Sequence, residues 1–318
     1  MANLKTNVIT FLSLALAVLF AANAQSYVLQ GPHIIQLVTD KLGQANTLFV
    51  SQRVIFYNID PTPELLDEAN DHTAADDTFE SPNSQPAGMD DMAVAPVETN
   101  SIELEESIRY VFSRAFRSDI ISDTNQRIYV YNRGRTLMVI DGVIAKFSES
   151  RFDLYKDLLL FRSRETLSDR LVNLGIDVTV SSLGKFDDRI ALVIGAEYPD
   201  ETVSQIWVDK ETFQPQRLII PSAGDERNGI LEVRYSDWQP IGKTWYPLQI
   251  EFIQDGTTVR TIAVSHYQIN PKFSEDIFDI GRLMSEYRQS EQVPGEAGNQ
   301  QGLSEVQKTI EDFKKIFE

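Results

Sequence analysis

The sequence predicts a mainly β fold with α-helices, built on an antiparallel sheet that curls around an apolar interior. From Ile176 to Asn270 the chain consists of short segments with strand-like alternation, separated by turn-forming pairs such as Asp187-Asp188 and Asp255-Gly256. Short connections of this kind join antiparallel neighbours. Two earlier segments, His33–Leu42 and Ser150–Leu174, instead place apolar residues three and four apart, which is typical of helices.

The N-terminus has the pattern of a cleavable signal peptide, predicted over residues 1–24. Lys5 precedes an apolar stretch from Ile9 to Ala22, which is shorter than the roughly 20 residues that a membrane-spanning helix needs. Ala22-Asn23-Ala24 then supplies small residues where a signal peptidase would cut. The alternative is a retained N-terminal anchor. We expect export through the bacterial inner membrane, with no integral membrane segment after cleavage.

The sequence contains no cysteine. An exported domain of this size therefore has no disulfide to constrain its unfolded state, and its stability depends on its core. A bacterial lipoprotein needs a cysteine directly after its signal sequence to carry lipid, whereas Gln25 and Ser26 stand there. The mature protein is accordingly expected to be soluble in the periplasm.

The first predicted elements after residue 24 are one helix and one strand. The helix covers His33–Leu42, because its apolar residues lie on one face, Pro32 suits a first helical turn and Gly43 suits an end. Leu48–Asn58 then alternates between an apolar and a mixed face, as a half-buried strand does.

Residues 60–100 are predicted to form a disordered acidic insert between two strands. The formal net charge of the chain is −18, and 14 of its acidic residues fall between Asp60 and Glu106, where Lys and Arg are absent. Such a composition buries too little apolar surface to offset the entropy of ordering. A functional acidic tether is the alternative. The chain also lacks the basic stripe that would neutralise phosphates, so no nucleic-acid partner is expected.

The remaining pattern predicts one domain over residues 25–287, followed by a linker and a C-terminal amphipathic helix over residues 288–318. Ser107–Phe116 alternates, and Asn132-Arg133-Gly134 is a hairpin turn between Arg127–Tyr131 and Arg135–Ile140. Ser150–Leu174 is helical. Further strands are predicted at Ile176–Leu183, Arg189–Ala196, Gln205–Asp209, Gln216–Ile220, Ile230–Tyr235, Thr244–Gln254 and Thr257–Asn270.

Catalytic and metal-binding patterns are nearly absent from the sequence. Of the three histidines, His72 falls in the acidic insert, His33 begins a helix, and His266 lies in an alternating strand. Convergent ligand spacings, phosphate-binding loops and nucleophile elbows are missing. We therefore expect no catalytic residue, metal or cofactor and no enzymatic activity. Two carboxylates converging in a cleft would be needed to support a glycan-cleaving alternative.

Aromatic residues on the short strands are the strongest candidates for a binding site. They form either an ordinary solid core or the lining of an apolar cavity, and composition does not separate these two possibilities. The candidate lining residues are Phe49, Phe56, Tyr110, Phe112, Tyr129, Tyr131, Trp207, Phe213, Trp245 and Phe252.

Several short motifs resemble the periplasmic lipoprotein carrier family (LolA-like, with LolB and the sigma-factor regulator RseB as structural relatives). They are Phe49-Val50-Ser51-Gln52 in the first strand, Phe116-Arg117 at a strand end, and Ile140-Asp141-Gly142 at a turn. The segment from Gln205 to Leu218, with Trp207, Val208, Asp209, Thr212, Pro215 and Arg217, is similar to a strand-turn-strand of that family.

The resemblance implies an incomplete, half-open antiparallel barrel of about eleven strands, closed on one side by a helical lid that holds acyl chains against the sheet. In such carriers an arginine on an early strand contacts the lid, and Arg53 is the nearest match in position.

Two functional hypotheses follow. The first is a periplasmic carrier that sequesters the acyl chains of lipoproteins or other amphiphilic ligands in the barrel. The alternative is a regulatory or scaffold domain on the same fold, which binds an envelope protein through the acidic loop or the C-terminal helix. Deletion of Leu303–Glu318 would distinguish them.

Overall fold

The computed structural model describes residues 28–57, 101–122, 126–145, 150–221 and 229–289. The predicted signal peptide, the acidic insert, His72 and the C-terminal helix lie outside the described residues. Within these ranges, no helix combines the length and apolarity needed to cross a membrane.

The described strands form one 14-stranded sheet, compared with about eleven strands expected from the family resemblance. Its order is β14-β6-β5-β4-β3-β2-β1-β13-β12-β11-β10-β9-β8-β7, so the two edges stay apart and the sheet is open. All neighbours are antiparallel except β14 and β6. The strands are β1 (Thr47–Tyr57), β2 (Ser101–Val111), β3 (Ala115–Ile121), β4 (Gln126–Asn132), β5 (Arg135–Ile140), β6 (Val143–Ile144), β7 (Ser181–Phe186), β8 (Arg189–Ile194), β9 (Gln205–Asp209), β10 (Pro215–Pro221), β11 (Ile230–Ile241), β12 (Thr244–Gln254), β13 (Thr257–Ile269) and β14 (Arg288–Gln289).

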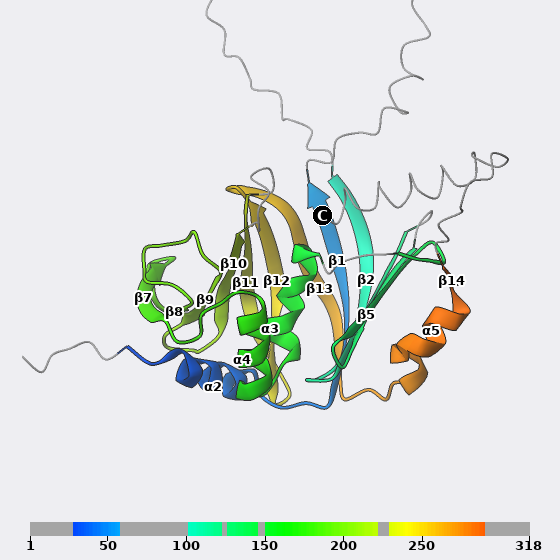
Figure 1. Cartoon of the computed structure of the whole chain (residues 1–318), viewed down its shortest axis with the longest axis horizontal. Coiled ribbons are helices and arrows are strands. Elements are labelled where there is room, and N and C mark those ends of the chain that lie inside the picture. Colours follow the sequence, from blue (N-terminus) through cyan, green and yellow to red (C-terminus); the bar gives the residue numbers. More distant parts are fainter. Residues whose placement is uncertain (1–27, 58–100, 123–125, 146–149, 222–228, 290–318) are drawn as a thin grey trace, which may run out of the picture.

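The sheet curves, and most of the helical residues lie inside the curve (Figure 1). These inner elements are α2 (Gly31–Leu42), the 3-10 helix η2 (Arg151–Lys156), α3 (Asp157–Leu160) and α4 (Arg164–Asn173). A second 3-10 helix, η4 (Glu275–Phe278), leads to α5 (Ile280–Glu286), which lies on the opposite side beside β5. We call the face that meets α2–α4 the inner face and its reverse the outer face.

The predicted first helix and strand are confirmed. Pro32 lies in the first turn of α2, and Gly43 ends it with a φ of 75°, a conformation that glycine adopts without strain. In β1, Leu48, Val50, Gln52, Val54 and Phe56 are buried on the inner face, while the residues between them are more exposed. The predicted alternation therefore describes the strand correctly.

Three predicted strands are wrong in detail. One is the strand expected at Ile230–Tyr235, because β11 continues to Ile241. Ser107–Phe116 is not one strand, because the chain turns at Phe112–Arg114 between β2 and β3, and Ser113 adopts a φ of 59° there. The strand expected to begin at Ile176 begins at Ser181 instead. Ile176 lies before this strand and is buried in the same apolar cluster as the inner helices.

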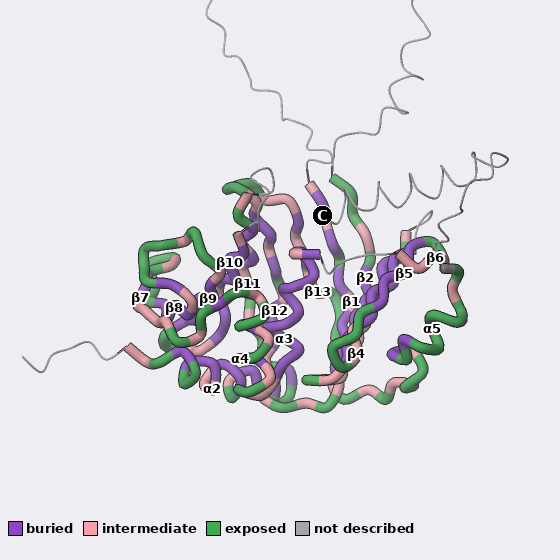
Figure 2. The backbone as a smooth tube through the Cα atoms, viewed as in Figure 1, coloured by how far each residue is buried: buried purple, intermediate pink, exposed green. Residues whose placement is uncertain are grey.

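Three clusters of buried apolar residues hold the layers together. The largest joins the inner face to α2, η2, α3 and α4. A second lies on the outer face, where Ile280 and Leu283 of α5 pack on Ile128 and Val139. The third, around Trp207, lies on the outer face near β7. Figure 2 shows buried residues along the central strands and the inner helices, in contrast to the mostly exposed α5.

Candidate ligand-binding interior

The inner face and residues 150–174 enclose the largest apolar region of the described chain. We call residues 150–174, which contain η2, α3 and α4, the covering segment. Leu158, Leu159 and Leu160 of this segment are fully buried against the sheet. Phe152 and Tyr155 pack against Phe252 of β12, with ring centroids 5.8 and 5.6 Å apart. The covering segment therefore occupies the space along the inner face.

Local sequence signals explain why the covering segment is helical but broken. Ser150 caps η2 by accepting a hydrogen bond from Phe152 N, and Ser163 caps α4 by accepting one from Thr166 N. The chain is extended at Phe161 between these helices. Gly175 ends α4 with a φ of 79°. Three short helices, rather than one long one, follow the curved face.

A small number of polar contacts tie the covering segment to the sheet. Arg127 Nη2 of β4 donates to Asp153 Oδ2 at 2.6 Å, and both side chains are buried. The Tyr235 hydroxyl of β11 donates to the backbone carbonyl of Tyr155 at 3.0 Å. Ser113 N donates to the carbonyl of Leu160 at 2.8 Å. These contacts, together with apolar packing, position the segment.

A cluster of four polar residues lies between the sheet and the covering segment, and we call it the seam cluster: Gln52, Glu106, Tyr155 and Arg260. Gln52 Nε2 donates to Glu106 Oε2 at 2.6 Å, and Arg260 Nη2 lies 3.8 Å from the same oxygen. The Arg260 guanidinium faces the rings of Phe252, Phe56 and Tyr155, with Cζ 4.7, 5.3 and 5.8 Å from their centroids. All four residues are buried.

Several polar atoms of the seam cluster have no hydrogen-bond partner among the described residues. They are Gln52 Oε1, Arg260 Nε, Arg260 Nη1 and the Tyr155 hydroxyl, which lies near the Gln52 side chain. Burial, and then the charge of Glu106, raise the pKa of Tyr155 well above its ordinary value, so its hydroxyl is neutral. Unpaired buried polar groups cost free energy. The seam cluster is therefore the strongest candidate for contact with a polar part of a ligand.

A second polar group lies where β2, β12 and the covering segment meet. The hydroxyls of Tyr110 and Tyr246 are 3.1 Å apart, and burial raises the pKa of both. Arg162 stacks on Phe112, with Cζ 4.4 Å from the ring centroid, and donates to the carbonyl of Leu42. Burial lowers the pKa of Arg162 to about 10, which leaves the guanidinium charged at neutral pH.

The structure brings only some of the predicted lining residues together. Phe56, Tyr110, Tyr129 and Phe252 are buried within the inner cluster. Phe112, Tyr131 and Phe213 pack at its margin. Phe49 lies on the outer face below Arg109, and Trp245 is half-buried with Lys41 Nζ 4.0 Å from its ring centroid.

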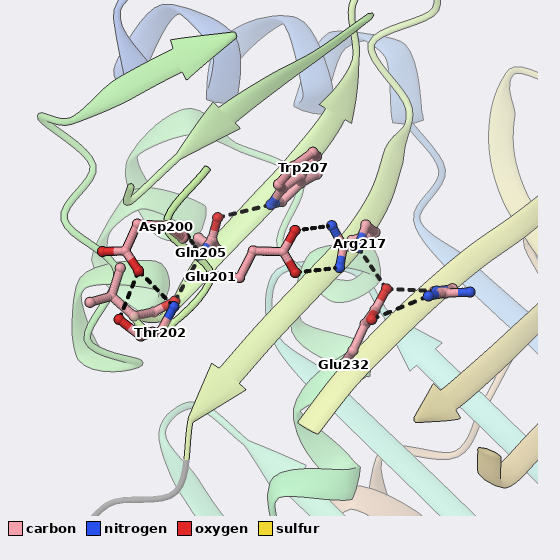
Figure 3. Close-up of polar contacts among 9 residues, drawn as sticks. Asp200, Glu201, Thr202, Gln205, Trp207, Arg217 and Glu232 are labelled. Carbon is pink, nitrogen blue, oxygen red and sulfur yellow. Dashed lines mark hydrogen bonds and ion pairs between the residues drawn. The ribbon is translucent and has the colours of Figure 1, made fainter. Parts of the chain in front are cut away.

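Trp207 lies on the outer face and belongs to a separate network. Arg217 Cζ is 4.6 Å from its ring, and Arg217 also donates to both carboxylate oxygens of Glu201 at 2.9 Å (Figure 3). Arg217 Nε donates to Glu232 at 2.6 Å, and Gln205 Oε1 accepts from Trp207 Nε1 at 2.9 Å. Arg217, which stacks on Trp207, therefore anchors the loop that carries Glu201, and Trp207 does not line the interior.

Arg53 does not hold the place expected for it. It lies on the outer face, where Nη1 pairs with Glu103 at 3.3 Å and both side chains are about half exposed. Alternation along β1 directs the neighbouring Gln52 inward and Arg53 outward. Two other arginines of the sheet face the covering segment: Arg127 on β4, which pairs with Asp153, and Arg260 on β13, which lies against Tyr155.

Sequence reasoning missed Arg260 and Glu106 as interior residues. A charged residue in a strand is usually exposed, so composition directs attention away from such positions. A signal was nonetheless present, because Gln52 and Arg260 lie in phase with the apolar residues of their strands. A polar residue in the inward phase of a strand is the pattern that could have identified the seam cluster.

The described residues contain no group of three or more His, Cys, Asp or Glu that could hold a metal ion. His33 and His266 are exposed. Surface pockets of about 410, 560 and 290 Å³ among the described residues are lined mostly by polar residues. The apolar interior is thus a different kind of site from these surface pockets.

Comparison with known proteins yields similarities of structure alone. Neither a protein-family model nor a curated protein matches the sequence. Among solved structures, a domain described as an outer membrane lipoprotein-sorting protein from Vibrio parahaemolyticus is 9% identical, with 79% of this chain and 97% of that one covered and a TM-score of 0.45. A LolA superfamily protein from Nitrosomonas europaea is 11% identical, with 79% and 98% covered and a TM-score of 0.47.

The MucA/MucB complex of Pseudomonas aeruginosa is also similar. The identity is 11%, the match covers 80% of this chain and 62% of that one, and the TM-score is 0.27. The LolA family that the sequence motifs resemble is therefore among the structures similar to this chain. At these identities and TM-scores the likeness is one of fold and assigns no function.

Proposed function

We propose that this protein is a periplasmic, non-enzymatic carrier that binds the acyl chains of lipoproteins or other amphiphilic ligands on its inner face, beneath the covering segment. One observation carries the proposal: a curved apolar sheet face is covered by three short helices, and partnerless polar atoms are buried between the two. A core that served stability alone would leave few such atoms unpaired.

Binding requires the covering segment to move, since its side chains lie against the inner face. Acyl chains would then replace Phe152, Tyr155 and the leucines of α3 along β12 and its neighbours. Each Å² of apolar surface removed from water contributes roughly 25 cal/mol, so a single long chain offsets a substantial cost of displacement. No bond is made or broken in this cycle.

Native mass spectrometry of the mature protein, followed by lipid extraction, tests the proposal. We expect adducts whose mass corresponds to acylated molecules and whose removal lowers the melting temperature, because a ligand that binds only the folded state stabilises it. Purified protein that carries no lipid and takes up none from mixed micelles would contradict the carrier function. Capture of an envelope protein by such lipid-free protein would support the regulatory alternative instead.

A further inference from the structure

The seam cluster contains polar groups that a hydrocarbon chain does not satisfy. We propose that it recognises a neutral secondary amide attached to the acyl chain, so that the interior prefers N-acylated ligands over esters and free fatty acids. This inference rests on the proposed function. It adds a polar recognition element at the middle of the sheet, where β2, β1 and β13 are neighbours.

Arg260 supplies the donors for a carbonyl oxygen. Its Nε and Nη1 atoms are buried and without partners among the described residues, while Nη2 is directed to Glu106. The rings of Phe56 and Phe252, which belong to the sheet, flank the guanidinium, and Tyr155 covers it until the covering segment moves. A carbonyl oxygen that reaches Nε and Nη1 would complete the hydrogen bonding of this side chain.

Gln52 supplies the matching acceptor. Because Nε2 donates to Glu106 at 2.6 Å, the orientation of the amide is fixed and Oε1 is the free atom. The Tyr155 hydroxyl lies near the Gln52 side chain while the covering segment is closed. Once that segment moves, the buried acceptor requires a donor from the ligand, and a secondary amide provides N–H beside its carbonyl. An ester offers the carbonyl oxygen but leaves Gln52 Oε1 unpaired.

The charge of the site argues against an anion. Glu106 balances Arg260, and it also accepts a hydrogen bond from Ser118 Oγ. A carboxylate would add a further negative charge near Glu106 in a water-excluded site and would offer acceptors only. An amide is neutral and offers both a donor and an acceptor. The expected order of affinity is therefore amide, then ester, then carboxylate.

Three ligands with the same chain test this order: N-methylpalmitamide, methyl palmitate and palmitate, each used to displace N-phenylnaphthylamine at neutral pH. We expect the amide to bind about tenfold more tightly than the ester. The amide N–H makes one additional hydrogen bond, and that bond gives the buried acceptor Gln52 Oε1 a partner. In Gln52→Met, the preference for the amide over the ester should disappear. Gln249→Met, at an exposed position of β12, is the matched control and should keep the wild-type order.

The outcomes separate the two proposals. Equal binding of amide and ester by the wild type would overturn the amide site, as expected if water alone satisfies the cluster, and would leave the carrier function intact. Failure of all three ligands to displace the probe would overturn both. The order of ligand affinities is measured on the wild-type protein, so the test remains valid if Gln52→Met does not fold. An N-palmitoylated peptide and an N-palmitoylated amino sugar carry the same amide. The one that binds more tightly identifies whether the natural ligand is an acylated peptide or an acylated sugar.

Discussion

At the scale of single residues, burial decides what an ion pair contributes. Glu106 and Arg260 are almost completely buried, with side-chain exposures of 2% and 1%, whereas Glu103 and Arg53 are 54% and 50% exposed. The two glutamates lie on the same strand, three residues apart. An exposed pair is screened by water, while loss of one partner of a buried pair leaves the other charge without compensation.

This contrast predicts different effects of the same substitution. Glu106→Gln should lower the free energy of unfolding by about 3–5 kcal/mol, because Arg260 then remains charged in an apolar surround. Glu103→Gln should cost less than about 1 kcal/mol. Urea denaturation of both variants measures the difference. Equal destabilisation would mean that water reaches Arg260, and the seam cluster would then be a solvated site.

The outer-face network predicts a pH dependence that belongs to Glu232. Burial opposes ionisation of this residue, but hydrogen bonds from Arg217 and Arg234 prevail and lower the pKa of Glu232 below 4.5. In the pH range between the two pKa values, the unfolded state binds more protons than the folded state, so stability rises with pH. The contribution is therefore complete above about pH 4.5 and is lost as the pH falls through the folded-state pKa.

Glu232→Gln isolates this contribution. The difference in unfolding free energy between wild type and variant should be largest near neutral pH and should shrink as the pH falls below about 4.5. Chemical denaturation across this pH range measures it. A difference that stays constant with pH would show that Glu232 does not carry the charge that holds Arg217.

At the scale of elements, hydrophobic periodicity correctly predicted the helices, strands and turns that depend only on residues close together in the sequence. The helix α2, the strand β1 and the β4–β5 hairpin follow from apolar spacing and from the turn Asn132-Arg133-Gly134. The turn after β2 was missed because Ser113, rather than glycine or asparagine, adopts the positive φ there. In β9 every residue is buried, so its pattern does not reveal that Trp207 lies on the outer face.

For the interior, the sequence likewise predicted some residues correctly and missed others. Four of the predicted aromatics, Phe56, Tyr110, Tyr129 and Phe252, meet there. The seam cluster escaped prediction since it is assembled from β1, β2, β13 and η2, which are far apart in the sequence. Which residues of these strands come into contact depends on the register between the strands, and a single sequence does not determine that register.

The covering segment should open as a unit, and Tyr235 tests this. Tyr235→Phe removes the hydrogen bond to the carbonyl of Tyr155, which contributes about 1 kcal/mol. Amide exchange over residues 150–174 should then accelerate about fivefold, with the central strands unchanged. Tyr267→Phe, on an exposed part of β13, is the control. Acceleration spread evenly over the sheet would show that the segment does not open separately.

At the scale of the whole molecule, the carrier mechanism divides the protein into a fixed sheet and a moving cover. Each strand from β6 to β2 and from β13 to β8 is paired on both sides, and β1 joins the two halves. The covering segment instead is held by side-chain packing and a few polar contacts. Local opening is therefore expected there, since few backbone hydrogen bonds to the sheet oppose it.

A cross-link between the two parts tests this division directly, and the absence of cysteine makes an engineered disulfide specific. Ser113 Oγ accepts a hydrogen bond from Arg162 N at 3.1 Å, which brings the β2–β3 turn close to the covering segment. In Ser113→Cys/Arg162→Cys, we expect oxidation to slow uptake of N-phenylnaphthylamine about tenfold or more and reduction to restore it, because the closed form no longer opens. The reduced protein is its own control for the two substitutions. Uptake at the same rate before and after reduction would mean that ligands reach the inner face without movement of this end of the cover, and the entry route would then lie along the open edges of the sheet.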